Sequence, residues 1–122
     1  LTGGSGGDLM TGGGNADRFS FLDGDFGAMT LDGADRITDF SRAERDKIKL
    51  AGLDANTANG ADSVDRFSVI GANAFSGMAG QLRWETQSGA TIVMGDRDGD
   101  AAADFWIRLD GIIALTASDF IL

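Results

Sequence analysis

The chain has 122 residues, no cysteine, histidine, proline or tyrosine, and a formal net charge of −9. This length is enough for one domain with a single core, while the missing cysteine and histidine exclude disulfides and thiolate sites and argue against a zinc site. The acidity argues against a nucleic-acid partner, and no stretch is long and apolar enough to span a membrane.

Nearly all the acidic residues are aspartate, since only Glu44 and Glu85 among the 19 are glutamate. Aspartate beside glycine is typical of metal-binding loops, because a short side chain brings its carboxylate into the same turn. Two carboxylates about 4 Å apart repel each other by on the order of a few kcal/mol at an effective dielectric near ~20. We therefore expect these loops to need a cation.

The chain opens with two nine-residue segments in the same phase, residues 3–11 and 12–20. Aligned with each other, they pair Gly3 with Gly12, Gly4 with Gly13, Asp8 with Asp17, and Met10 with Phe19. They match the calcium-binding nonapeptide G-G-x-G-x-D-x-U-x of the parallel β-roll, in which U is a large apolar residue. Asn15 replaces the glycine of the fourth place, and asparagine tolerates a left-handed backbone better than most residues. A Gly/Ser linker would not explain the phased aspartates and apolar residues.

After the repeats the sequence predicts short strands between polar turns. Residues 18–22 favour a strand, and residues 23–27 favour a turn that leaves the nonapeptide register, so we expect the roll to stop there. Further strands are predicted at residues 33–40, 46–50, 66–70, 80–85, 90–94, 105–109, 112–115 and 120–122. The run 80–94 has the pattern of a hairpin, and within it Trp84 is interpreted as a packing residue rather than a sugar platform.

Three aspartates lie beside the strands that follow the repeats. Asp35 and Asp39 are either calcium ligands or solvated turn carboxylates, and the sequence leaves both interpretations open. Asp46 has a weaker claim to ligation. Between Asp39 and Asp46, Ser41 is placed to cap one polar helical turn.

Residues 95–104 form a second acidic segment. Four aspartates occupy places 1, 3, 5 and 9 of a loop that starts like an EF-hand: Asp96, Asp98, Asp100 and Asp104. The glycine of place 6 is replaced by Ala101 and the acidic residue of place 12 by Ile107, so the loop is not an EF-hand. A single-loop calcium site and a plain Asp-Gly turn between strands both fit.

Taken in order, these parts resemble the C-terminal domain of the serralysin-type metalloproteases, which also ends other bacterial proteins exported by the type I route. The matching pieces are residues 3–20, G-A-D-R-I-T-D-F at 33–40, D-K-I-K-L at 46–50, the acidic run 95–105, and S-D-F-I-L at 118–122. The resemblance implies an all-β fold in which a short calcium-binding parallel β-roll continues into a β-sandwich. Residues 1–122 are then one domain, with roll repeats at 1–27 and a sandwich cap at 28–122.

The resemblance also implies which residues hold Ca²⁺. The repeat carboxylates are those of Asp8 and Asp17, and their partners are turn carbonyls around Gly3, Ser5, Gly6, Gly12, Gly14 and Asn15. No intact third repeat follows on the edge that carries Asp8. Its site is therefore either completed by Asp23 or Asp25 or left incomplete.

At the C-terminus the resemblance implies an uncleaved signal for a type I ABC transporter, in which an acidic residue precedes a few apolar ones. This pattern corresponds to Asp119, Phe120, Ile121 and Leu122. The chain starts inside a repeat and without a start methionine, so we expect it to be the end of a longer secreted bacterial protein with an upstream domain. The H-E-x-x-H motif of the proteases is absent, so no protease activity carries over.

The sequence therefore predicts a non-catalytic module that folds on calcium outside the cell and carries an export signal. The alternative is a polysaccharide-binding or adhesive module, although the ten Lys and Arg residues are scattered along the chain and give no obvious basic groove. An enzyme in its own right has the least support, because the aspartates lie in turns and Glu85 stands alone.

Overall fold

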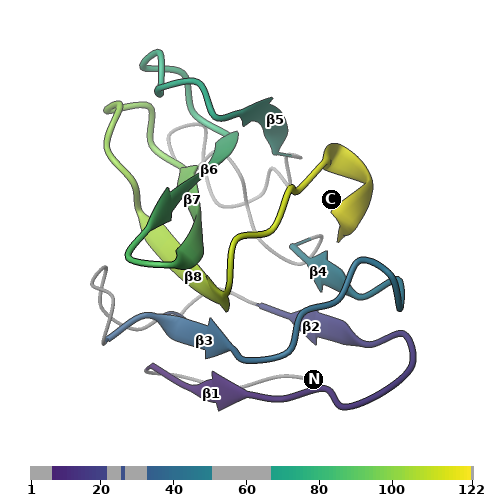
Figure 1. The fold of residues 1–122 in the computed structure, drawn as a ribbon. Coiled ribbons are helices and arrows are strands. Elements are labelled where there is room, and N and C mark those ends of the chain that lie inside the picture. Colours follow the sequence, from purple (N-terminus) through teal and green to yellow (C-terminus); the bar gives the residue numbers. More distant parts are fainter. Residues whose placement is uncertain (1–6, 22–25, 27–32, 51–66, 122) are drawn as a thin grey trace.

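The computed structural model describes residues 7–21, 26, 33–50 and 67–121, and this part is all-β, as predicted (Figure 1). A six-stranded sheet has the order β1-β3-β8-β7-β6-β5, and a three-stranded sheet has the order β2-β4-β9. The strands are β1 (Leu9–Met10), β2 (Arg18–Ser20), β3 (Asp35–Ile37), β4 (Lys47–Lys49), β5 (Ser68–Gly71), β6 (Gln81–Gln87), β7 (Ala90–Asp96), β8 (Phe105–Asp110) and β9 (Phe120–Ile121). One 3-10 turn, η2 (Ala117–Asp119), precedes β9.

The chain winds between the two sheets in parallel coils. β1 pairs with β3 and β3 with β8, while β2 pairs with β4 and β4 with β9, all in parallel. Parallel neighbours cannot be joined by a tight hairpin, so the chain crosses to the other sheet between them. Each coil therefore gives one strand to each sheet: β1 with β2, β3 with β4, and β8 with β9. This parallel winding extends beyond residue 27, because alternating strands continue it without the glycine motif.

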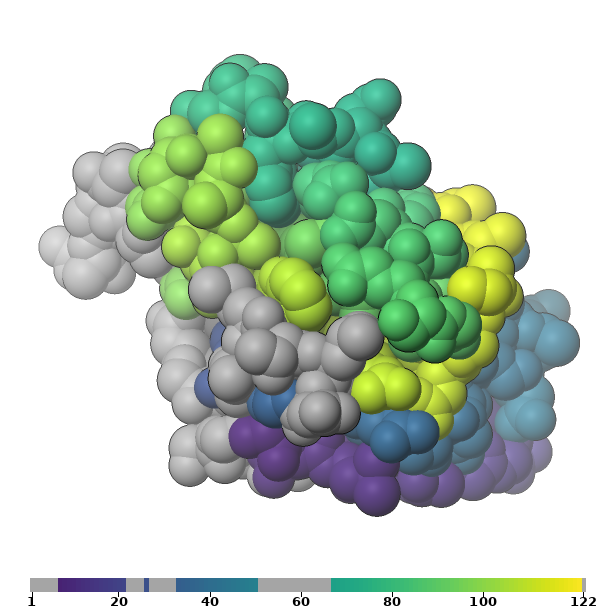
Figure 2. Space-filling model, turned by 60° about the vertical axis from the view of Figure 1, so that its left-hand side comes forward, coloured from purple at the N-terminus to yellow at the C-terminus, as the bar shows by residue number. Residues whose placement is uncertain are grey.

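An antiparallel hairpin of β6 and β7, which comes between β4 and β8 in the sequence, widens the larger sheet on the far side of β8. Its register runs from Gln81 opposite Asp96 to Gln87 opposite Ala90. The two turn residues, Ser88 and Gly89, have φ of 50° and 78°. Positive φ at both central positions suits the right-handed twist of the strands, which confirms the predicted hairpin. In Figure 2 the N-terminal coil forms one end of the molecule, and the region around β5 and β6 forms the opposite end.

Apolar side chains from alternating strand positions fill the space between the sheets. The fully buried members of this core are Phe19, Phe21, Ile37, Ile48, Leu50, Leu82, Val93, Phe105, Ile107 and Leu109. Burying each such side chain contributes about 1.5–3 kcal/mol. Trp84 packs on the edge of this core, with its ring stacked on Phe120 at a centroid distance of 5.6 Å. This contact confirms that Trp84 is a packing residue.

The predicted strand at 112–115 is wrong. After β8 the chain does not turn back along its neighbour but crosses to the smaller sheet, where β9 pairs with β4. The crossing segment is held by side-chain contacts instead of a strand ladder, since the Ile113 N–H donates to Thr91 Oγ1 at 2.9 Å. Ile112 points outward and is 67% exposed. The first part of the predicted strand 66–70 and Leu122 lie outside the described residues.

Candidate metal centres

The turn between β1 and β2 has the backbone that the nonapeptide requires. Gly13 has φ of 83° and Asn15 of 68°, so Asn15 holds the left-handed conformation expected of its place in the repeat. A Cβ on Gly12 would lie 2.5 Å from Oδ2 of Asp17. The Asp17 carboxylate thus lies over its own turn, in space that only a glycine leaves open.

Aspartates of successive coils are linked at the start of the strands. The Asp8 N–H donates to Asp35 Oδ1 at 2.7 Å, and the Asp17 N–H donates to Asp46 Oδ1 at 2.8 Å. Asp35 and Asp46 are 1% and 0% exposed. Asp46 therefore has the same position relative to Asp17 that Asp35 has relative to Asp8. This equivalence was not foreseen, although all four aspartates stand at or just before the first residue of a strand. Ligation by Asp46 stays an open prediction.

Asp39 joins two stacked turns. Its carboxylate accepts the N–H of Gly12 at 2.9 Å through Oδ1 and the N–H of Gly13 at 2.6 Å through Oδ2. Each carboxylate oxygen has further lone-pair capacity beyond one such bond. These bonds place a second negative charge at the turn that already contains Asp17. The β1–β2 turn and the β3–β4 turn of the next coil therefore form one acidic column.

Two carboxylate oxygens at the starts of β1 and β2 are buried without a hydrogen-bond partner in the described part of the chain: Asp8 Oδ2 and Asp17 Oδ2. A buried acceptor left unsatisfied costs about 1–3 kcal/mol, and more when it is charged. The carboxylate of Asp35 accepts the N–H of Asp8, and that of Asp46 accepts the N–H of Asp17. Carboxylate oxygens are ligands of hard cations such as Ca²⁺. The donor set and these two oxygens thus fit a bound cation.

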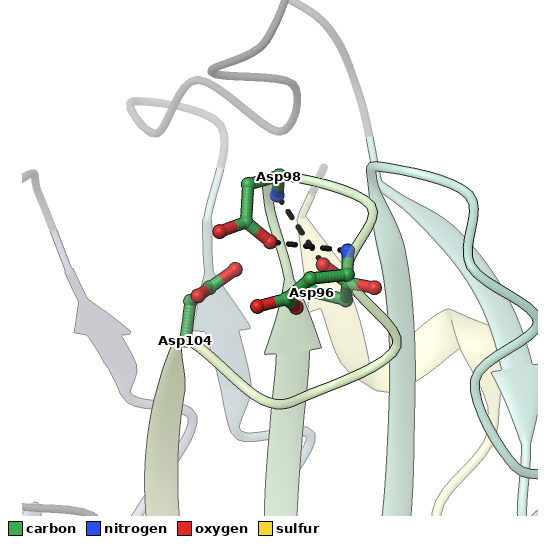
Figure 3. A group of neighbouring side chains, drawn as sticks. Asp96, Asp98 and Asp104 are labelled. Atoms are coloured by element: carbon green, nitrogen blue, oxygen red, sulfur yellow. Dashed lines mark hydrogen bonds between the residues drawn. The ribbon is translucent and has the colours of Figure 1, made fainter.

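The loop between β7 and β8 brings four carboxylates together: those of Asp96, Asp98, Asp100 and Asp104 each offer an oxygen within 4.8 Å of the others. Figure 3 shows the side chains of Asp96, Asp98 and Asp104 turned toward the same space inside the loop. Asp96 is 0% exposed and its carboxylate accepts the N–H of Gly99 at 2.8 Å and of Ala101 at 3.0 Å. Ala101 has φ of 64°. The loop could hold a metal ion, although its aspartates also organise the turn.

The electrostatics of this loop reflect its crowded negative charge. A hydrogen bond with Asp100 raises the pKa of Asp98 from 3.8 to about 6, and desolvation and the nearby charge of Asp104 act in the same direction. One carboxylate of the loop therefore keeps a proton at mildly acidic pH when no cation is bound. A divalent cation would take the place of that proton.

The structure separates the predicted site residues into groups. Asp8 and Asp35 lie where β1 and β3 begin. The β1–β2 turn and the β3–β4 turn contain Asp17, Asp39, Gly12, Gly14 and Asn15, and the β7–β8 loop, with the last residue of β7, contains the four aspartates of 96–104. Gly3, Ser5, Gly6, Asp23 and Asp25 lie outside the described residues, so the completion of the Asp8 site stays a prediction.

The chain matches a known protein family over its whole length. The model of the family described as Peptidase M10 serralysin C terminal matches residues 1–122. A search of the curated proteins found no matching relative. Within the described ranges, no helix is long and apolar enough to cross a membrane.

Proposed function

The chain belongs to the Peptidase M10 serralysin C-terminal family, a non-catalytic part of typically secreted bacterial metalloproteases, and from this premise we propose that it is a calcium-binding folding and export module. In this proposal residues 1–122 act as one unit that orders on Ca²⁺ outside the cell. Its C-terminal residues are the type I export signal for an upstream domain.

The observation that carries the proposal is the pair of buried carboxylate oxygens, Asp8 Oδ2 and Asp17 Oδ2, which have no hydrogen-bond partner in the described residues. Asp35, Asp39 and Asp46 bring further carboxylates to the same turns. These aspartates, with turn carbonyls around Gly12, Gly14 and Asn15, would hold Ca²⁺. The aspartates of the 96–104 loop would hold a further ion. The ion would neutralise charges that otherwise repel each other.

Calcium-dependent order follows from these charges. With 19 acidic and 10 basic residues, the unloaded chain has to bring carboxylates together against their mutual repulsion and order many glycines. Extracellular calcium sites often bind at ~0.1–1 mM. A site at ten times its dissociation constant adds about 1.4 kcal/mol of stability, so several sites together can fold the domain. Inside the cell, where free calcium is scarce, the same chain would stay loose.

Circular dichroism and thermal melting in millimolar calcium and in EGTA test this function. We expect a β-sheet spectrum and a cooperative melt in calcium, and loss of both in EGTA. Asp17→Asn removes the buried charge and should raise the calcium needed for folding about tenfold, the effect of ~1.4 kcal/mol. Glu44→Gln removes one charge from an exposed residue of the 41–46 turn and should leave the calcium midpoint unchanged. An identical spectrum of the wild type in both buffers would refute the proposal.

A second candidate, an anionic polysaccharide as ligand, is favoured by one grouping of cations. Arg18 is the register partner of Lys47 in the smaller sheet, and Lys49 lies two residues further on the same face. Arg42 and Arg45 lie in the turn before β4, so five of the ten basic residues gather here, of which Arg42 pairs with Asp119 and Lys47 donates to the Ser118 carbonyl. Retardation of the chain in a gel that contains a polyuronate, abolished in Lys49→Glu, would support this ligand.

A further inference from the structure

The outer face of the six-stranded sheet, which points away from the core, has an aromatic side chain on a central strand. Along β8 every second side chain belongs to the core, so Trp106, Arg108 and Asp110 point to the other face. Trp106 is only partly buried, and it packs on a second apolar cluster that contains its register partner Met94. Arg83 is the next residue in the same cross-strand row. A partly exposed indole ring therefore lies on the sheet surface among polar side chains.

The polar side chains of this face hold one another in fixed directions. Arg36 donates through Nε and Nη2 to the two carboxylate oxygens of Asp110, at 2.7 and 2.8 Å. Arg108 Nε lies 3.7 Å from Oδ1 of the same carboxylate. On β6, Gln87 Nε2 donates to Glu85 Oε1 at 2.7 Å. Because these groups are oriented before a ligand arrives, binding costs little additional side-chain entropy.

The same groups extend across four neighbouring strands. The register places Glu85, Ile92, Arg108 and Arg36 side by side on β6, β7, β8 and β3. Since neighbouring strands lie about 4.8 Å apart, this row is about 14 Å long. The row that contains Trp106 lies beside it, two residues away along β8. The surface therefore suits an extended, linear ligand.

The charge of this face differs from that of the whole chain. The chain has a net charge of −9, whereas here Arg36, Arg83 and Arg108 stand against the carboxylates of Glu85 and Asp110. Ion pairs join Arg36 to Asp110 at 2.7 Å and Arg83 to Glu85 at 3.5 Å, so the face has no strong attraction for a free ion. An indole ring beside paired donors and acceptors instead fits a ligand with apolar C–H groups on one face and hydroxyl groups at its edge. Neutral sugars have this combination.

We propose that the outer face of the six-stranded sheet, centred on Trp106, binds a neutral polysaccharide chain. The indole ring packs on a sugar ring, while Arg36, Arg108 and Glu85 exchange hydrogen bonds with the sugar hydroxyl groups. This site is separate from the basic residues of the smaller sheet and needs no charge on the ligand. It adds a ligand to the proposed function and requires only that the domain is folded.

Isothermal titration calorimetry of the 122-residue chain in millimolar calcium tests the site, with dextran, laminarin and cellohexaose as neutral probes. We expect one of these probes to bind, with an affinity that added salt leaves unchanged because no net charge is involved. Trp106→Ala should weaken this binding by about tenfold or more, as expected for a central aromatic contact. Trp106→Phe keeps an aromatic ring and should weaken it less. Glu85→Gln should weaken it severalfold, and Lys49→Ala, on the smaller sheet, should bind like the wild type.

Several results would overturn the site. They are no heat with any of the three probes, equal affinity in the wild type and Trp106→Ala, or a loss in Lys49→Ala as large as in Trp106→Ala. Displacement of the neutral probe by a polyuronate would also overturn it, because the ligand would then belong to the basic residues. Should Trp106→Ala fail to fold, wild-type affinity in both Trp106→Phe and Glu85→Gln would have the same meaning.

Circular dichroism of the same samples in calcium and in EGTA separates this site from the proposed function. A chain that binds a neutral probe but has one spectrum in both buffers would refute the calcium-dependent function and keep the site. A chain that folds on calcium and binds none of the probes would keep the calcium function and refute the site.

Discussion

Ala101 holds a left-handed backbone, with φ of 64°, in the middle of the acidic loop. It occupies the place at which a calcium loop of the EF-hand type has glycine. The left-handed conformation costs an L-residue roughly 1–2 kcal/mol, and the greater chain entropy of glycine offsets part of that cost. We expect Ala101→Gly to raise the free energy of unfolding by about 0.5–1 kcal/mol.

Thermal melting in calcium measures this difference, and Ala102→Gly is its control. Ala102 is exposed and is not among the described residues with positive φ. Glycine there should leave the melting temperature unchanged or lower it by a few degrees, the effect of up to ~1 kcal/mol. If the two substitutions shift the melting temperature in the same direction and by the same amount, the strain assigned to Ala101 is wrong.

Residue by residue, the sequence predicts conformation where a motif demands it and fails where packing decides. Asn15 was expected to hold positive φ because of its place in the repeat, and it does. Gly7 stands at an unconstrained place of the nonapeptide, yet a Cβ there would collide with the carbonyl oxygen of Gly33 in the next coil. The close contact between Gly7 and Gly33 joins segments that are far apart in the sequence. The equivalence of Asp46 and Asp35 was missed for the same reason.

At the scale of the elements, the contribution of the loop between β7 and β8 to stability should depend on pH through Asp98. The hydrogen bond with Asp100 raises the pKa of Asp98 above its ordinary 3.8, to about 6. A carboxyl group with a raised pKa in the folded state stabilises the fold while it is protonated, and this contribution is lost as pH rises through the folded value. In calcium-free buffer we therefore expect stability to fall between about pH 4 and pH 6–7 at this site.

Because the calcium-free chain is expected to be unfolded in plain buffer, folding of the wild type and of Asp98→Asn across this range is measured in EGTA with added sucrose, which favours the compact state. Asp98→Asn cannot titrate, so its stability should lack the part of the pH dependence that Asp98 causes. In saturating calcium the wild-type slope should reverse, because the ion competes with the proton for the carboxylates and binds better as pH rises. Parallel pH profiles of the two proteins in calcium-free buffer would show that Asp98 does not retain its proton in the loop.

Most strands could be predicted because they alternate apolar and polar residues over a few positions. The pattern at 46–50 corresponds to β4, and the run around Ser88 and Gly89 to the β6–β7 hairpin. The pattern at 112–115 is equally apolar, but the chain uses it to cross between sheets. Local sequence does not say which neighbour a strand meets. The parallel pairing beyond residue 27 was likewise not visible in the motif.

At the scale of the whole molecule, the coils stack in an order that brings both the first and the last described strands into contact with the second coil. β1 and β2 pair with β3 and β4, and β9 pairs with β4 from the opposite side. The family and the all-β fold could be predicted from the order of short motifs along the chain. The burial of Asp119 could not, because Arg42 is its partner across 77 residues of sequence.

Deletion of residues 119–122 should abolish type I export, since it removes the proposed signal. The deletion also removes Phe120 from its contact with Trp84, and therefore destabilises the fold. Trp84→Ala breaks the same contact at a cost of about 3 kcal/mol but keeps the four terminal residues. Because the signal would be recognised in the unfolded chain, Trp84→Ala should be exported at least as well as the wild type.

Quantitative blotting of the medium and of the cells, in a host with a type I exporter, measures both variants. The deletion should accumulate inside, while Trp84→Ala should reach the medium. Equal loss of export in the two variants would mean that export depends on the stability of the domain and not on the terminal residues. Normal export of the deletion would remove the signal from this segment altogether. We expect export and folding to be separable in this chain because Asp119 and Phe120 become buried only once the coils have formed.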